Sequence, residues 1–206
     1  IEDKLIGEEF SLMSITDGNG NVKQFPPIQD YKRLDEGDKG PNTGGMGCVI
    51  DRNNSLPFLD QEDIVICENI NNIIIDNLNK NGVGKKNKIG YRGILYGSFI
   101  KQRNNKIKII EFNSRFGDPE CLIALSLLKN NLYNICNEII NKNLKSNLLF
   151  DNSSMLAVYL VPRNYPSFTE SEIINIDNVN DTIKNNIIYG NIEEKNGNLY
   201  NLSSRT

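Results

Sequence analysis

Three side chains in the segment EFNSRFG, residues 111–117, could bind a metal ion and a phosphate group. A strand is predicted over residues 106–112. Alternate residues of a strand share a face, so Glu111 and Asn113 point the same way, as does Arg115 if the extended backbone continues. A carboxylate and an amide oxygen suit Mg²⁺, which completes its shell with water and phosphate. An adjacent arginine can bind a phosphoryl group with two N–H groups. The pattern predicts a Mg²⁺–nucleotide site; the alternative is a solvated strand edge with an incidental ion pair.

A second segment, GDKGPNTGGMGC over residues 37–48, has the glycine content of loops that bind phosphate through backbone N–H groups. It does not match the P-loop pattern, because Gly47 is followed by Cys48 and Val49 instead of Lys and then Ser or Thr. It does not match the dinucleotide fingerprint either, because Ile50 stands where a third glycine is required. A phosphate-binding loop and a plain surface turn both stay open for this segment.

The composition excludes several classes of function. The chain has 206 residues, enough for one domain or one domain with a smaller piece. Its net charge of −3 gives no reason to expect nucleic acid or an anionic membrane as a partner. The absence of histidine and the scattered cysteines argue against a zinc site and a His-based triad. We expect buried free thiols, no membrane span and a cytoplasmic location.

The first half of the chain is predicted to contain a hairpin, a loop and a helix. Residues 8–25 form the hairpin, with its turn at DGNG, and residues 26–47 form a long, irregular polar loop. Residues 59–82 form a helix that Asp60 caps and Gly82 ends. The expected apolar face of this helix consists of Ile66, Ile70, Ile73, Ile74 and Leu78.

The second half supplies the elements around the EFNSRFG segment. Strands over residues 90–102 and 106–112 form a hairpin. A helix over residues 118–129 has Asp118 as its N-cap and Pro119 at its first position. A further helix covers residues 132–144, and a new set of strands begins after about residue 150.

Five strings occur in the order and spacing of one enzyme family: GEEFSLM, QDYKR, DKGPNTGGMG, YRGILYGSF and IIEFNSRFGDPE. The chain thereby resembles the glycinamide ribonucleotide synthetases (phosphoribosylamine–glycine ligases) of the ATP-grasp superfamily, strongly up to about residue 125 and weakly beyond it. The resemblance implies an α+β chain. Residues 1–149 would form the C-terminal part of an ATP-grasp domain, a large lobe with an antiparallel sheet and flanking helices. Residues 150–206 would begin a small β-rich C-terminal domain.

The resemblance also implies a reaction. ATP, glycine and 5-phosphoribosylamine would give glycinamide ribonucleotide, ADP and phosphate through glycyl phosphate, with Mg²⁺ or Mn²⁺ as the metal. Glu111 and Asn113 match the family's metal ligands, and Arg115 matches an arginine expected to stabilise the transferred phosphoryl group. The N-terminal domain and the first ATP-grasp lobe would be missing from this chain. We therefore expect the chain to be a fragment that binds ATP weakly and is inactive alone.

Residues for the adenosine part of ATP follow from the same resemblance. The N-terminal IEDKL resembles the hinge that receives adenine, with Glu2 beside the adenine amino group and Leu5 along the ring. Glu8 or Glu9 resembles the carboxylate that binds the ribose hydroxyls, and the spacing favours Glu9. A frayed chain end and a charged strand edge are the alternatives.

The remaining residues implied by the resemblance bind substrate. In QDYKR, Asp30 and Arg33 are expected at the substrate, and Lys32 is expected to neutralise phosphate during catalysis; Tyr31 stands where the family has His. Asp118 would contact substrate beside a helix N-terminus, or would only cap the helix. The expected points of closest approach to phosphate or glycine in the glycine-rich segment are Thr43, Gly44 and Gly45.

Two other functions stay open at this point. One is an ATP-grasp enzyme with a different acceptor, which the family-specific GPNTGGMG string argues against. The other is a degenerate nucleotide-binding or structural remnant, a hypothesis that the Asn-rich helices favour. Against the remnant, the Asn-rich filler stops at the DKGPNTGGMG and EFNSRFGDPE strings.

Overall fold

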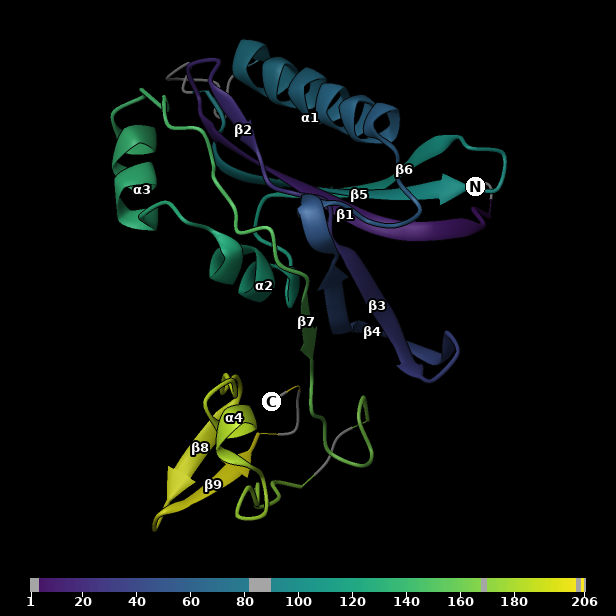
Figure 1. Ribbon diagram of the computed structural model, residues 1–206, viewed down its shortest axis with the longest axis vertical. Coiled ribbons are helices and arrows are strands. Elements are labelled where there is room, and N and C mark those ends of the chain that lie inside the picture. Colours follow the sequence, from purple (N-terminus) through teal and green to yellow (C-terminus); the bar gives the residue numbers. More distant parts are fainter. Residues whose placement is uncertain (1–3, 82–89, 168–169, 203–204, 206) are drawn as a thin grey trace. The chain divides into compact units, whose positions relative to one another are not determined.

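The computed structural model describes residues 4–81, 90–167, 170–202 and 205 (Figure 1). The chain divides into two compact units. The larger unit consists of residues 1–31 and 47–157, and the smaller unit consists of residues 32–46 and 158–206. The expected division between residues 149 and 150 stays a prediction.

A four-stranded antiparallel sheet forms the centre of the larger unit, with strand order β2-β1-β5-β6. The strands are β1 (Gly7–Asp17), β2 (Val22–Gln24), β5 (Arg92–Gln102) and β6 (Ile107–Asn113). Both predicted hairpins are confirmed. The turn after β1 is closed by Asp17, whose Oδ1 accepts hydrogen bonds from the backbone N–H groups of Asn19 and Asn21.

Helices cover the two faces of this sheet (Figure 1). Helix α1 (Gln61–Asn81) packs on the face that carries Phe10, Leu12 and Phe99. Helices α2 (Glu120–Leu127) and α3 (Leu132–Ile140) pack on the opposite face, around Met13 and Ile15. Because strand side chains point alternately to the two faces, the sheet contributes residues to two separate apolar cores. The antiparallel sheet with flanking helices is the architecture expected for this lobe.

Helix α1 begins as predicted, but its buried face is only partly the predicted one, since Ile70, Ile74 and Leu78 are half-buried. The Asp60 carboxylate accepts a hydrogen bond from the Asp63 N–H at 3.0 Å, and the Asp63 carboxylate accepts one from the Asp60 N–H at 3.1 Å. Ile66 and Ile73 are 39% and 59% exposed, although both were expected in the apolar face. The fully buried positions are Asp63, Cys67, Asn71 and Ile75.

Specific hydrogen bonds explain the polar residues on that buried line. The Asn71 amide donates to the Leu12 carbonyl at 3.0 Å and to the Ser14 hydroxyl at 2.8 Å, and Asp63 forms an ion pair with Lys101 of β5. An apolar pattern could not reveal these partners, because they lie on other strands. Gly82, the predicted helix end, lies outside the described residues.

The segment predicted as an irregular loop contains two strands. Strands β3 (Gln29–Asp35) and β4 (Lys39–Ile50) form a three-stranded sheet with β7 (Met155–Val158), in the order β3-β4-β7. Gly37 and Asp38 adopt positive φ angles of 73° and 58° in the turn between β3 and β4. Such residues favour tight hairpin turns, so the expected loop was wrong and the glycine-rich string lies on a strand.

The remaining elements are short. They are the 3₁₀ helix η1 (Arg52–Asn54), helix α4 (Asp181–Lys184), and the hairpin of β8 (Ile192–Lys195) and β9 (Asn198–Asn201). No helix within the described ranges is long and apolar enough to cross a bilayer.

Candidate metal and nucleotide site

Glu111 and Asn113 lie side by side near the end of β6, as predicted. In the sheet register Glu111 is opposite Ser98 and Asn113 is opposite Tyr96, so both side chains lie on the face that carries Met13. The Asn113 Nδ2 donates a hydrogen bond to the Glu111 Oε1 at 2.8 Å. Glu111 is exposed and Asn113 is half-buried, so the pair is accessible from solvent.

The residue between them fixes the face on which they stand. Phe112 points to the opposite side of the sheet, where its ring meets that of Phe99 edge to face with centroids 6.5 Å apart. A register shift lies immediately before the pair, since Ser98 pairs with Glu111 and Phe99 pairs with Ile109. A one-residue error in register would exchange the two faces, so the packing of Phe112 against Phe99 keeps Glu111 and Asn113 on the opposite face.

The donor set of this pair fits a hard divalent cation. It offers one carboxylate and one amide, which are the oxygen ligands that Mg²⁺ and Mn²⁺ accept. No three His, Cys, Asp or Glu residues gather as a metal cluster among the residues that the structure describes. Two protein ligands leave most of the coordination to water and phosphate, as is usual for Mg²⁺. To bind together with Glu111, Asn113 must present its Oδ1 instead of its Nδ2.

Arg115 is not part of the strand. Strand β6 ends at Asn113, and the Arg115 Nη1 donates to the Phe116 carbonyl at 2.8 Å. The extension that would have placed Arg115 on the same face therefore does not persist. The arginine is exposed in the bend that follows the two oxygen ligands.

The two candidate ribose ligands lie on opposite faces of the sheet. Glu9 is opposite Ile100 in the register, and it shares its face with Ser11 and therefore with Glu111. Glu9 and Glu111 lie on β1 and β6, with β5 between them, and they are offset along the strands by one pleat repeat. Ordinary sheet spacing then puts them about 12 Å apart. Glu8 lies on the other face, beside Phe10. The geometry favours Glu9, as the spacing did. Leu5 is half-buried, and Glu2 lies outside the described residues.

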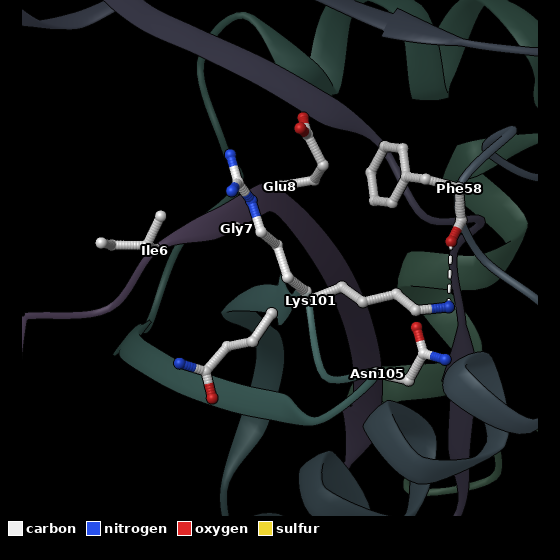
Figure 2. Close-up of a pocket in the computed structure, with 8 residues that line it drawn as sticks. Ile6, Gly7, Glu8, Phe58, Lys101 and Asn105 are labelled. Carbon is white, nitrogen blue, oxygen red and sulfur yellow. Dashed lines mark hydrogen bonds between the residues drawn. The ribbon is translucent and has the colours of Figure 1, made fainter.

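A shallow pocket opens on the Glu8 side (Figure 2). Figure 2 shows Lys101 extending across it toward Phe58, whose carbonyl accepts a hydrogen bond from the Lys101 Nζ at 3.0 Å. The hydrogen bond with Asp63 raises the pKa of Lys101. This ammonium is thus engaged in holding α1 to the sheet. The full lining is Ile6, Gly7, Glu8, Phe58, Lys101, Gln102, Arg103 and Asn105.

Asp30 is buried, with 8% of its surface accessible, and its expected role at the substrate stays a prediction. Burial raises the pKa of Tyr96, and the negative charges of Asp30 and Glu120 raise it further. These three side chains therefore form an acidic group inside the larger unit.

Asp118 does not cap the helix that follows it. Helix α2 starts at Glu120, and its N-cap residue is Pro119, which supplies no side-chain hydrogen bond. The first helical N–H groups are satisfied by backbone carbonyls instead, because Cys121 N–H donates to Gly117 O at 3.0 Å and Leu122 N–H donates to Pro119 O at 2.9 Å. The predicted N-cap role of Asp118 was wrong.

The predicted residues of the smaller unit are tied together by backbone contacts. The Thr43 hydroxyl donates to the Lys32 carbonyl at 2.9 Å and accepts from the Gly45 N–H at 3.1 Å. The Arg33 Nη1 donates to the Gly40 carbonyl at 2.8 Å, across the β3–β4 turn. The Gly45 N–H is therefore hydrogen-bonded within the hairpin, and the approach of this segment to phosphate or glycine stays a prediction.

An arginine that the sequence did not single out also contacts this hairpin. The Arg205 Nη1 donates to the Gly45 carbonyl at 3.0 Å, and its guanidinium lies 4.7 Å from the ring centroid of Tyr159. A side chain at Gly44 would meet the same guanidinium at 3.1 Å.

Comparison with known proteins agrees with this architecture. The sequence profile described as phosphoribosylglycinamide synthetase, ATP-grasp (A) domain matches residues 1–121, more than half of the chain. The chain belongs to the phosphoribosylglycinamide synthetase family. The phosphoribosylamine–glycine ligase of Methanocorpusculum labreanum is 39% identical over the whole of this chain, which covers 46% of that relative.

Comparison of this chain with solved structures agrees with an ATP-grasp fold. The crystal structure of phosphoribosylamine–glycine ligase from Thermotoga maritima matches 99% of the chain with a TM-score of 0.77 and 28% identity, and the chain covers 48% of it. The N5-carboxyaminoimidazole ribonucleotide synthetase of Thermotoga maritima matches 84% of the chain, covering 39% of that protein, with a TM-score of 0.54 and 14% identity, which shows the fold alone. The chain thus spans about half the length of these relatives.

Two buried residues of the larger unit were missed by sequence reasoning. Tyr96 lies on β5 beside Asn113 in the sheet register, and its hydroxyl donates to the Glu120 Oε1 at 2.7 Å. Glu120 is the last residue of the string EFNSRFGDPE, so the sequence contained a signal for it. A glutamate directly after proline at a helix start is ordinary, however, and only the fold brings it to Tyr96.

Proposed function

We propose that this chain is the metal-binding and ribose-binding part of an ATP-dependent ligase that joins glycine to 5-phosphoribosylamine. The products would be glycinamide ribonucleotide, ADP and phosphate, with glycyl phosphate as the intermediate, in de novo purine synthesis. The observation that carries this proposal is the pair of oxygen ligands, Glu111 and Asn113, side by side near the end of β6 and accessible from solvent. The names of the relatives that match the whole chain support the choice of substrates.

Residues at different positions on the sheet of the larger unit would bind different parts of the metal–ATP complex. Glu9 would accept hydrogen bonds from the ribose hydroxyls, while Glu2 and Leu5 would line the adenine. About 12 Å away by sheet spacing, Glu111 and Asn113 would hold Mg²⁺ or Mn²⁺ between the phosphates. A bound divalent ion neutralises charge on the transferred phosphoryl group. Arg115 would add a second positive charge at the same group.

The residues of the smaller unit would handle the other substrates. Lys32 and Arg33 are cations of β3 suited to phosphate, and the Thr43 and Gly44 backbone would approach the acyl phosphate or the glycine carboxylate. Two carboxylates of the larger unit, Asp30 and Asp118, are proposed at the substrate amines, since carboxylates attract ammonium groups. Alignment of the acyl phosphate with the amine would then supply much of the rate acceleration.

We further propose a cytoplasmic enzyme. All four cysteines are free, and Cys48 and Cys67 are buried. Burial raises the pKa of the Cys67 thiol to about 12, so this sulfur stays protonated and inert. Unpaired, buried thiols are typical of a reducing compartment.

The test measures ADP release by the complete polypeptide that carries this chain, because the relatives are about twice as long. Release should require both glycine and phosphoribosylamine. Glu111→Gln and Asn113→Ala should each lower kcat by more than about 100-fold, since loss of a residue that only supports a metal ligand already costs 10-fold to 100-fold. Glu62→Gln, the same chemical change at an exposed position of α1, should leave the rate unchanged.

The outcomes separate the competing functions. ADP release that is independent of glycine would point to an ATP-grasp enzyme with another acceptor. No ADP release under any condition, together with normal folding, would favour a degenerate remnant. Wild-type rates in both site variants would remove Glu111 and Asn113 from the metal site.

A further inference from the structure

A buried hydrogen bond between two side chains supports the backbone segment that follows Asn113. The Tyr96 hydroxyl donates to the Glu120 Oε1 at 2.7 Å, and the two residues are 5% and 2% exposed. Tyr96 comes from the middle of β5, and Glu120 is the first residue of α2. Because a hydrogen bond to a carboxylate in a buried setting is strong, this contact joins α2 firmly to the sheet.

Gly117 lies directly against both partners. A Cβ at this position would stand 2.6 Å from the Glu120 carboxyl carbon and 2.6 Å from the Tyr96 Cε2, which is far inside van der Waals contact. The Gly117 N–H donates to the Met13 Sδ at 3.5 Å, and its carbonyl accepts from the Cys121 N–H at 3.0 Å. The glycine backbone is therefore held from the sheet side and from the helix side.

The same tyrosine stands next to the proposed metal site in the sheet. Tyr96 is the register partner of Asn113 on one side and of Met13 on the other. Only Ser114, Arg115 and Phe116 separate the strand end at Asn113 from the anchored Gly117. A strand end followed by so short a connection can move little when both ends are fixed.

We propose that Glu120 is a positioning residue, which acts through Tyr96 and Gly117 to hold Asn113 beside Glu111 and to set the bend that carries Arg115. This inference rests on the proposed metal site. Glu120 itself is buried, and it reaches the strand end through its hydrogen bond with Tyr96. Its role is comparable to that of residues behind a metal site, which fix the orientation of the ligands.

The variants are chosen to remove the hydrogen bond with little change of shape. Tyr96→Phe deletes only the hydroxyl. Glu120→Ala removes the acceptor, and Glu120→Gln keeps an oxygen that can accept from Tyr96. Tyr91→Phe is the matched control, because the Tyr91 hydroxyl also donates within the larger unit, to the Ile94 carbonyl, away from Asn113.

The measurements are made on the complete enzyme and include readouts other than activity. Binding of Mn²⁺ in the presence of ADP is followed by electron paramagnetic resonance, and amide hydrogen exchange is followed over residues 113–121. Tyr96→Phe and Glu120→Ala should weaken Mn²⁺ affinity by about 10-fold or more and speed exchange in this segment. Glu120→Gln should restore most of the affinity. Tyr91→Phe should lower the melting temperature with Mn²⁺ affinity within about twofold of wild type.

Each result decides the inference. If Tyr96→Phe melts at a lower temperature but binds Mn²⁺ as the wild type does, Glu120 and Tyr96 only stabilise the fold. If Glu120→Ala does not fold, Tyr96→Phe alone gives the decision. A wild-type enzyme that binds no Mn²⁺ with ADP overturns the metal site itself, and this failure is distinguishable because it appears before any variant is made.

Discussion

The two compact units of the chain differ sharply in what they bury. Among the described residues, nearly all buried apolar side chains lie in the larger unit, most of them in two clusters on the two faces of its sheet. The buried carboxylates are also confined to the larger unit: Asp17, Asp30, Asp63 and Glu120. The described part of the smaller unit buries only Gly45, Pro162 and Asn201.

This difference separates two ways of presenting functional groups. In the larger unit, Glu111 and Asn113 stand on a strand whose other face is packed, so their side chains have a fixed support. In the smaller unit, the Thr43–Gly45 segment is held by hydrogen bonds along a hairpin with little apolar core. We therefore expect substitutions to be costly in the first region and mild in the second.

The largest effect is expected for Gly117→Ala. The added methyl would overlap the Glu120 carboxylate and the Tyr96 ring at 2.6 Å, and neither partner can move without leaving its hydrogen bond. Overpacking of this kind costs about 3 kcal/mol of unfolding free energy. Chemical denaturation measures the cost, and Mn²⁺ affinity should fall together with stability. A Gly117→Ala protein as stable as the wild type would contradict the idea of a rigid support in the larger unit.

A smaller, pH-dependent effect is expected for Asp17→Asn. Burial raises the pKa of Asp17, but hydrogen bonds from the Asn21 side chain and from the N–H groups of Leu144, Asn19 and Asn21 outweigh it, so the pKa is lowered. The stabilisation is therefore present above the unfolded-state pKa of about 3.9 and is lost as the pH falls through the lower folded-state pKa. Replacement by Asn should cost about 2 kcal/mol at pH 7, because an NH₂ group then faces N–H donors.

Denaturant titrations at several pH values test this expectation. The stability difference between the wild type and Asp17→Asn should shrink as the pH falls below about 4. Asp76→Asn, at an exposed position of α1, is the control and should show a difference near zero throughout. A difference that is constant down to acid pH would mean that the hydrogen bonds to Asp17 do not depend on its charge.

Local signals in the sequence were sufficient for much of the larger unit. Alternation and turn residues predicted both hairpins, and Asp60 marked the start of α1. The E-x-N spacing predicted that Glu111 and Asn113 share a face, because a strand period of two depends only on the backbone.

Non-local contacts account for the errors. Asn71 and Asp63 are buried because their partners lie on β1 and β5, which no helical pattern contains. The β3–β4 hairpin was missed because its glycines were interpreted as a possible phosphate-binding loop. In the structure, Gly37 and Asp38 form the turn between the two strands. Glu120 drew no attention because its partner, Tyr96, is 24 residues away in the chain.

The smallest effects are expected in the glycine-rich strand, where two neighbouring glycines should respond differently. At Gly44 the atoms nearest to a methyl group would be at the end of the Arg205 side chain, at 3.1 Å, and this guanidinium can shift. Gly44→Ala should therefore change the unfolding free energy by less than about 0.5 kcal/mol. Gly45 has a φ angle of 125°, which L-residues rarely adopt, so Gly45→Ala should cost about 1 kcal/mol or more.

Hydrogen exchange of the amides in β3 and β4 measures both variants within the smaller unit. If Gly44→Ala proved as costly as Gly117→Ala, the smaller unit would have to contain rigid packing around Arg205, and the contrast between the units would fail. If Gly45→Ala cost nothing, the backbone at this position would be free to relax. A small cost at Gly44 and a larger one at Gly45 would locate the constraint in the backbone, which is the part of this strand proposed to approach the acyl phosphate.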